Sequence, residues 1–164
     1  MMLQSKLTVY AAIAAMLALM GGIVYYSSLD NPFLEQVEIE LESVQITNIN
    51  NIQNTATLQV TFLVTNPTDK TFTVPSISYE LFGDGQVIGA GQYSTEDIAM
   101  PGRAAFYGGA SIPLKSTMTI TADGGAQYQN IVSNNIQEYA ASGLITVESA
   151  WAIVEVNFES SMMQ

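Results

Sequence analysis

The chain has 164 residues, enough for one domain and an accessory segment, and it carries 15 acidic against 4 basic residues, a net charge of −11 at pH 7. It has no cysteine and no histidine, which excludes disulfides and thiolate chemistry and removes the commonest general base and transition-metal ligand. An acidic surface repels phosphate backbones, so the composition argues against binding nucleic acid and against docking on anionic lipid.

An uncharged apolar stretch predicts a single membrane-spanning helix over residues 7–26. At about 1.5 Å per residue it spans roughly 30 Å, the thickness of a hydrocarbon core. Tyr10 near one end, and Tyr25 and Tyr26 at the other, are placed to lie at the two membrane interfaces. Membrane lipid is therefore the expected partner of residues 7–26, and other membrane proteins could pack on the same helix.

The charges beside this helix predict its orientation. Lys6 precedes it, and no basic residue follows it before Lys70. The positive-inside bias then leaves residues 1–6 in the cytoplasm and the domain outside the cell membrane, joined to the helix by a linker over residues 27–33.

Two alternatives to a single-pass signal-anchor are a cleaved signal peptide and a buried core helix. The apolar run is longer than a usual signal core, and residues 18–20, Ala-Leu-Met, make a poor cleavage site. A membrane anchor is the favoured interpretation.

From residue 34 onward, apolar residues recur at every second position, which predicts β-strands. Val37, Ile39 and Leu41 alternate with glutamates, as in a strand with one buried and one solvated face. The apolar positions then shift by one, so we expect a β-bulge near residues 42–43. The next strand covers residues 57–65, with Leu58, Val60, Phe62 and Val64 pointing inward.

Turn residues divide the rest of the chain into short segments. Turns are expected at residues 66–69, 83–85 and 101–102, and strands over residues 77–81, 86–93 and 104–114.

One helix is expected to interrupt the strands. Tyr128, Ile131, Val132, Ile136 and Tyr139 form a single apolar stripe at helical spacing. This helix would begin near residues 123–125 and end before Gly143, and two final strands would cover residues 144–149 and 152–158. The pattern as a whole predicts a mainly β protein, a β-sandwich over residues 34–159 followed by a tail of residues 160–164.

The order of these segments resembles the late embryogenesis abundant group two family, also called the water-stress and hypersensitive-response domain. The resemblance covers residues 34–159 and is carried by Val64-Thr65-Asn66-Pro67, Val74-Pro75, Tyr79-Glu80-Leu81, Gly83-Asp84-Gly85, Gly89-Ala90-Gly91, residues 98–102 and Ser111-Ile112-Pro113-Leu114. It implies an immunoglobulin-like Greek-key β-sandwich, often behind a membrane anchor, that is not an enzyme and is associated with stress. This chain departs from the family in being more acidic and poorer in lysine, and no binding residue carries over to it.

The most conspicuous polar group is a row of glutamates, Glu38, Glu40 and Glu42. A straight strand cannot wrap a calcium ion, so a solvated face is favoured over a metal site. The loop carboxylates Asp84, Glu96 and Asp97 lack the spacing of a calcium loop and are interpreted as turn residues. The sequence therefore predicts no catalytic, cofactor-binding or metal-binding residue and no cofactor.

Trp151 is expected in the core, with a surface anchor for a partner as the alternative. The function that best fits the sequence is a membrane-anchored extracytoplasmic β-sandwich with a binding or structural role, stress-protective by resemblance. The alternative is a small accessory subunit of a larger membrane complex. No feature of the sequence identifies a small-molecule ligand.

Overall fold

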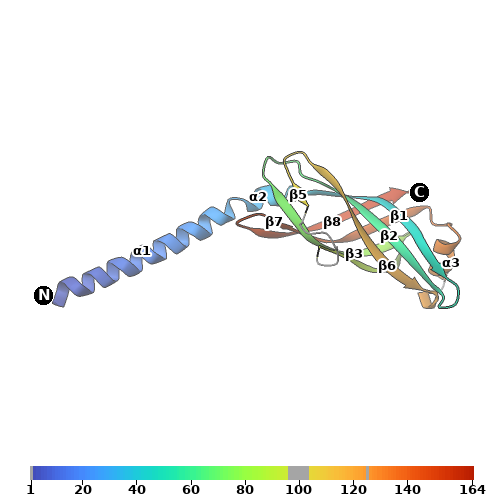
Figure 1. Cartoon of the computed structure of the whole chain (residues 1–164), viewed down its shortest axis with the longest axis horizontal. Coiled ribbons are helices and arrows are strands. Elements are labelled where there is room, and N and C mark those ends of the chain that lie inside the picture. The colour runs from blue at the N-terminus through green and yellow to red at the C-terminus, as the bar shows by residue number, and fades with distance from the viewer. Residues whose placement is uncertain (1, 96–103, 125) are drawn as a thin grey trace.

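The computed structural model describes residues 2–95, 104–124 and 126–164, and shows a long helix leading into a β-sandwich (Figure 1). The helices are α1 (Met2–Ser28), α2 (Asn31–Leu34) and α3 (Ala126–Val132), with a 3-10 turn, η1 (Ala122–Gly124). The strands are β1 (Glu38–Asn50), β2 (Thr55–Thr65), β3 (Phe72–Gly83), β4 (Gln86–Ser94), β5 (Ala105–Phe106), β6 (Ser111–Thr121), β7 (Glu138–Glu148) and β8 (Ile153–Met163).

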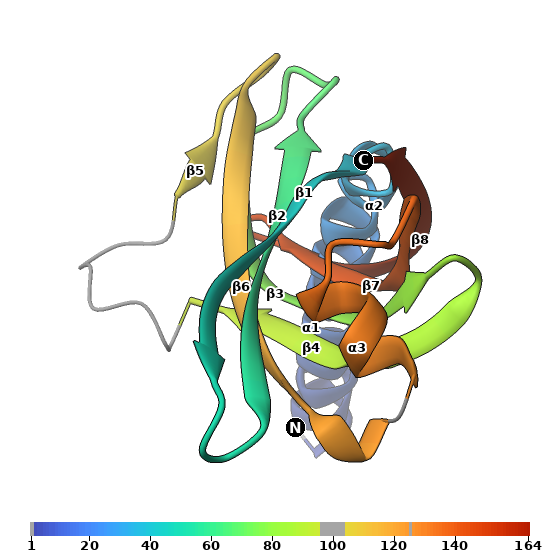
Figure 2. The same cartoon turned by 90° about the vertical axis from the view of Figure 1, so that its right-hand side faces the viewer.

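The strands form two antiparallel sheets that face each other (Figure 2). One sheet has the order β1-β2-β6, and the other has the order β4-β3-β7-β8, with β5 also paired to β3. In immunoglobulin lettering these are A-B-E packed on C′-C-F-G. The predicted immunoglobulin-like Greek-key sandwich is confirmed.

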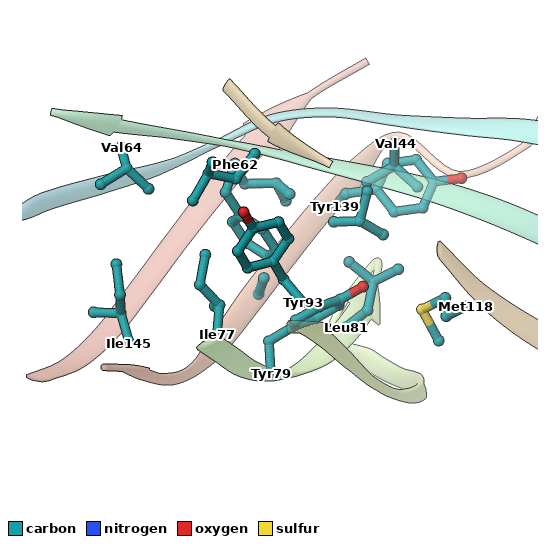
Figure 3. Close-up of a cluster of buried hydrophobic side chains, with 14 of the residues drawn as sticks. Val44, Phe62, Val64, Ile77, Tyr79, Leu81, Tyr93, Met118, Tyr139 and Ile145 are labelled. Atoms are coloured by element: carbon teal, nitrogen blue, oxygen red, sulfur yellow. The ribbon is translucent and has the colours of Figure 1, made fainter. Parts of the chain in front are cut away.

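The core is built from every second residue of the strands, whose side chains point into the space between the two sheets. Side chains from β1 and β2 point toward those of β3 and β7 between the sheets (Figure 3). The Phe62 ring packs against the Tyr79 and Phe158 rings in T-shaped arrangements, at ring-centroid distances of 4.8 and 5.6 Å, a preferred aromatic geometry. The four inward residues predicted for β2 are all buried, namely Leu58, Val60, Phe62 and Val64. In β3 the alternate residues Ile77, Tyr79 and Leu81 are buried as well.

The predicted bulge in β1 is also confirmed. The pairing with β2 shifts register between Leu41 and Ser43, and a second shift follows between Ile46 and Asn48. Because an extra residue changes which side chains face inward, Leu41 and Val44 can both be buried although they lie three positions apart.

Hydrogen bonds tie the sheets together at both open edges. The Tyr79 hydroxyl donates to Ser116 Oγ at 3.0 Å, and Ser116 Oγ donates to the Gln92 carbonyl oxygen at 2.8 Å, which links β3, β6 and β4. At the other edge, the Leu41 N–H of β1 donates to Ser160 Oγ of β8 at 2.9 Å. Ser160 lies in the part of β8 beyond residue 158, where the strand was expected to end.

The strand predicted over residues 104–114 is wrong. Residues 105–106 form the short β5, and a turn with the Ala110 N–H bonded to the Tyr107 carbonyl at 2.9 Å separates it from β6. Gly109 has a φ of +76°, a conformation that ends regular pairing. β6 then continues to Thr121, and its buried Ser116 conceals the alternation in the sequence.

The long helix predicted through Tyr139 is also wrong. α3 stops at Val132 because Asn134 is left-handed, with a φ of +55°. The N–H groups of Asn134 and Asn135 bond to the carbonyls of Ile131 and Asn130, at 3.0 and 2.8 Å, which is a Schellman cap with asparagine in the usual glycine position. Residues 138–148 form β7, so this strand begins six residues earlier than expected.

The burial of three tyrosines predicts that the free energy of unfolding falls at alkaline pH. Burial raises the pKa of Tyr79, Tyr93 and Tyr139 above the ordinary value of 10.0, with the Asp84 charge adding to the effect at Tyr139. Since the unfolded chain ionises first, this stabilisation is present below about pH 10 and is lost as the pH rises through the folded pKa values. We expect the urea midpoint of the intact chain in detergent to fall between about pH 9 and pH 11, and to fall less steeply in Tyr79→Phe. Equal slopes in the two proteins would contradict this assignment.

Candidate functional site: the apolar helix and the domain end beside it

The most distinctive feature outside the core is the uncovered apolar surface of α1. An 18-residue window within Lys6–Leu34 has a mean hydropathy of 2.2, and none of it is buried. By length and composition this helix could cross a membrane or serve as a signal segment. The alternative of a core helix is wrong, because residues such as Leu17 and Val24 are 65% and 67% exposed.

The junction between helix and domain is short and mostly helical. The hydroxyls of Ser27 and Ser28 donate to the carbonyls of Val24 and Tyr25, at 2.9 and 2.7 Å, in the last turn of α1. α2 begins three residues after α1 ends, and its last residue, Leu34, is fully buried. Residues 27–33, expected as a linker, therefore hold the end of α1 and most of α2.

Lys70, from the β2–β3 loop, contacts this junction. Its Nζ lies 3.9 Å from Asp30 Oδ1 and 5.7 Å from the centre of the Phe33 ring. The lysine is half-exposed, so each contact contributes at most about 1 kcal/mol. Together they fix the loop beside α2.

Trp151 is not in the core, contrary to the prediction. It is 63% exposed and lies in the turn between β7 and β8. Ser149 Oγ accepts the N–H groups of Trp151 and Ala152, at 3.2 and 3.1 Å, so the turn holds the indole outside the sheet. Its ring meets the Tyr26 ring edge to face, with centroids 6.4 Å apart.

Asn66 organises the loops at this end of the domain. Its Nδ2 donates to the carbonyls of Lys70 and Phe106, at 2.6 and 2.9 Å. Its Oδ1 accepts the N–H and the hydroxyl of Thr68, at 3.0 and 2.9 Å. The backbone of Asn66 pairs with Ala110 and Gly109. This fully buried amide joins the β2–β3 loop to β5 and to the turn before β6.

The polar residues singled out from the sequence that the structure describes do not form a cluster. Glu38, Glu40 and Glu42 are exposed on β1, and the residues described contain no group of three His, Cys, Asp or Glu side chains that could hold a metal ion. Asp84 has a φ of +48°, and its Oδ1 accepts the N–H groups of Gln137 and Glu138, both at 3.0 Å. It acts as a turn residue, while Glu96, Asp97 and the turn at residues 98–102 lie outside the described residues.

A small pocket of about 220 Å³ lies between β4, β6 and α3. Its lining mixes apolar side chains with Thr119, Thr121 and Gln127. Gln127 Oε1 is the only buried side-chain polar atom without a partner in the part of the chain that the structure describes. No carboxylate or amine lines this pocket, and Tyr128 is the titratable side chain among its lining residues.

The similarity to one solved structure supports the β-sandwich fold. No family model and no curated protein matches the chain. Among solved structures, the Arabidopsis thaliana protein AT1g01470 is similar over 77% of this chain and 80% of its own, with a TM-score of 0.51 and 14% identity. A protein from Archaeoglobus fulgidus covers 76% of this chain and 98% of its own, with a TM-score of 0.45 and 14% identity. At2g46140.1, described as a late embryogenesis abundant (LEA) protein, covers 96% and 87%, with a TM-score of 0.41 and 11% identity. At these identities the likeness to AT1g01470 concerns the β-sandwich and nothing beyond it.

Proposed function

We propose that this chain is a single-pass membrane protein in which α1 anchors a non-catalytic β-sandwich at the outer surface of the cell membrane. The sandwich works there by binding or as a structural element, in the manner of the late embryogenesis abundant group two family. In this proposal residues 7–26 form the span, and the domain begins at residue 34.

The observation that carries the proposal is that the domain closes its core without α1. The buried hydrophobic residues run from Leu34 to Val147, and none lies in the part of α1 whose side chains are described, residues 6–28. An isolated helix with every apolar side chain in water would expose more hydrophobic surface than a soluble monomer tolerates. A bilayer covers such a surface without any further protein contact.

The length of α1 favours a retained anchor over a cleaved signal, because its apolar run is longer than a usual signal core. α1 continues without interruption past residues 18–20 to Ser28, and Tyr26 contacts Trp151 of the domain. The side chains beyond the poor cleavage site therefore take part in the folded structure.

Membrane extraction tests the anchor. We expect the chain to remain in the membrane fraction after an alkaline carbonate wash and to dissolve in detergent. The variant Ala14→Lys/Leu17→Lys places two charges at the centre of the span, each opposing insertion by about 2.5–3.5 kcal/mol, and should appear in the soluble fraction. A soluble wild-type chain whose mass lacks the first twenty or so residues would instead identify a cleaved signal.

Protease treatment of intact cells or spheroplasts tests the orientation separately. The domain should be digested from outside, because Lys6 favours a cytoplasmic start. Complete protection of a membrane-bound chain would reverse the orientation. Native sizing after gentle detergent extraction separates a lone small protein from the alternative, a stable subunit of a larger membrane complex.

A further inference from the structure

We propose that the helix end of the sandwich rests on the lipid–water interface, with Trp151 as an interfacial anchor in the headgroup layer of neutral lipid. This inference rests on the proposed function, since it requires α1 to span the membrane. It adds a second membrane contact, made by the folded domain itself.

The position of Trp151 along the membrane normal follows from its partner. Tyr26 is the last residue of the predicted span, and the two rings are 6.4 Å apart. A tyrosine at the end of a spanning helix lies at the headgroup level. Trp151 must therefore lie at nearly the same depth, whichever side of the membrane the domain occupies.

The domain cannot easily swing Trp151 away from that depth. Only Leu29 and Asp30 separate α1 from α2, and the Leu29 N–H still bonds to the Tyr26 carbonyl at 3.2 Å. Leu34 is fully buried in the sandwich, and Lys70 contacts Asp30 and Phe33. A junction this short couples the depth of the helix to the depth of the domain end.

The exposed aromatic side chains of the domain gather at this end. Among the described residues beyond α1, three aromatics are exposed: Phe33 at 37%, Tyr107 at 67% and Trp151 at 63%. They come from α2, from the turn after β5 and from the β7–β8 turn, segments that lie where α1 meets the sandwich (Figure 1). Ile153, the first residue of β8 and two positions after Trp151, is 66% exposed as well.

The turn that carries Tyr107 packs against the β2–β3 loop, which also carries Lys70. A Cβ on Gly108 would lie 2.9 Å from the Thr68 carbonyl oxygen and 3.1 Å from Asp69 Cα, so the two loops are in close contact. Asn66 bonds both of them. Tyr107, Phe33 and Trp151 thus extend from one supported end of the domain.

The chemistry of these side chains identifies the lipid–water interface as the surface that they contact. Tryptophan and tyrosine combine an apolar ring with a polar N–H or O–H, and they favour a boundary with one wet side and one apolar side. Attraction to anionic lipid is opposed by the net charge of −11. A zwitterionic headgroup layer accepts the rings without that repulsion.

The chain contains one tryptophan and eight tyrosines, so emission excited beyond the absorption band of tyrosine reports on Trp151 alone. The intact chain is reconstituted into three separate preparations of phosphatidylcholine vesicles. The nitroxide label is on the headgroup in the first, high on the acyl chain in the second and near the end of the acyl chain in the third. We expect Trp151 to lose most of its emission with the headgroup and shallow labels and little with the deep label. Aqueous acrylamide should quench it less than it quenches free tryptophan.

A matched control moves the tryptophan to the opposite end. In Trp151→Phe/Ile52→Trp, the new indole replaces a side chain that is 94% exposed in the β1–β2 turn, one 11-residue strand away from the helix end, or roughly 35 Å. Its emission should be quenched by acrylamide and unaffected by any lipid label. Circular dichroism of both proteins confirms the same fold.

The outcomes separate this inference from the proposed function. If the vesicles float in a density gradient and the chain does not float with them, the membrane anchor itself is contradicted. A chain that floats while Trp151 is quenched by acrylamide alone overturns only the interfacial contact. Emission shielded from both kinds of quencher, and dependent on the protein-to-lipid ratio, would show that a second copy covers Trp151 and would also overturn it.

Discussion

Replacing Asn66 with alanine is expected to lower the free energy of unfolding by about 3–5 kcal/mol. The substitution removes both donors that satisfy the Lys70 and Phe106 carbonyls and the acceptor that serves Thr68. Leaving a buried polar group unsatisfied costs about 1–3 kcal/mol. Because the residue is fully buried, water cannot replace the amide without opening the loops.

Urea unfolding of the intact chain in detergent, followed by circular dichroism, measures this loss. Asn157→Ala is the control, since Asn157 is exposed on β8 and its substitution should change stability by no more than about 0.5 kcal/mol. Asn66→Asp keeps the acceptor but loses both donors, so it should be at least as destabilised as Asn66→Ala. An Asn66→Ala protein as stable as Asn157→Ala would show that the amide is not the tie between these loops.

The strands that could be predicted from the sequence are those with a plain period of two. In β2 the inward residues from Leu58 to Val64 are large and apolar, and the residues between them are mostly polar, so the faces are evident from the sequence. In β6 the inward series includes Ser116, whose hydroxyl is satisfied by Tyr79 and Gln92 from the other sheet. A polar residue that is buried because of distant partners has no signature in its own segment.

The error at α3 has a different physical origin. Ile136 and Tyr139 continue the apolar stripe of Tyr128 and Ile131, and all four are buried. Helical spacing alone therefore could not show that the chain changes direction after Val132. The signal for the stop was the Asn134-Asn135 pair, since asparagine tolerates the left-handed conformation that a Schellman cap requires.

The long apolar helix could be predicted from composition, but the domain end beside it could not. Trp151 and Tyr26 are far apart in sequence, and their contact depends on the way the β7–β8 turn and α1 meet in three dimensions. The apolar neighbours of Trp151 suggested a core position, whereas the turn formed around Ser149 places its ring outside. The domain end beside α1 thus depends on loop residues such as Trp151 and Lys70, which have no local sequence motif.

Replacing Gly143 with alanine is expected to lower the free energy of unfolding by about 3 kcal/mol, the upper end of the usual range for overpacking. The sequence suggested that Gly143 follows a helix, but it lies in the middle of β7, directly paired with Tyr79 of β3. A Cβ at this position would overlap the Ser78 carbonyl oxygen and lie 2.8 Å from Tyr79 Cα. Both are backbone atoms, so no change of rotamer relieves the overlap.

β3 has little freedom to move away from the added methyl group. On its other side it pairs with β4, where the Tyr79 ring lies so close to Gly91 that a Cβ there would also overlap it. The Tyr79 hydroxyl is bonded to Ser116 across the sandwich. The strain should therefore separate β3 from β7 and weaken the centre of the five-stranded sheet.

Ser142→Ala is the matched control for Gly143→Ala, because it changes the neighbouring residue of β7 at a half-buried position without adding a side chain against the backbone. It should alter the urea midpoint by an amount equivalent to less than about 1 kcal/mol. Amide hydrogen exchange locates the effect, with protection lost first along β3 and β7 in Gly143→Ala. If the two variants unfold at the same midpoint, the close approach of β7 to β3 does not limit the stability of the sandwich.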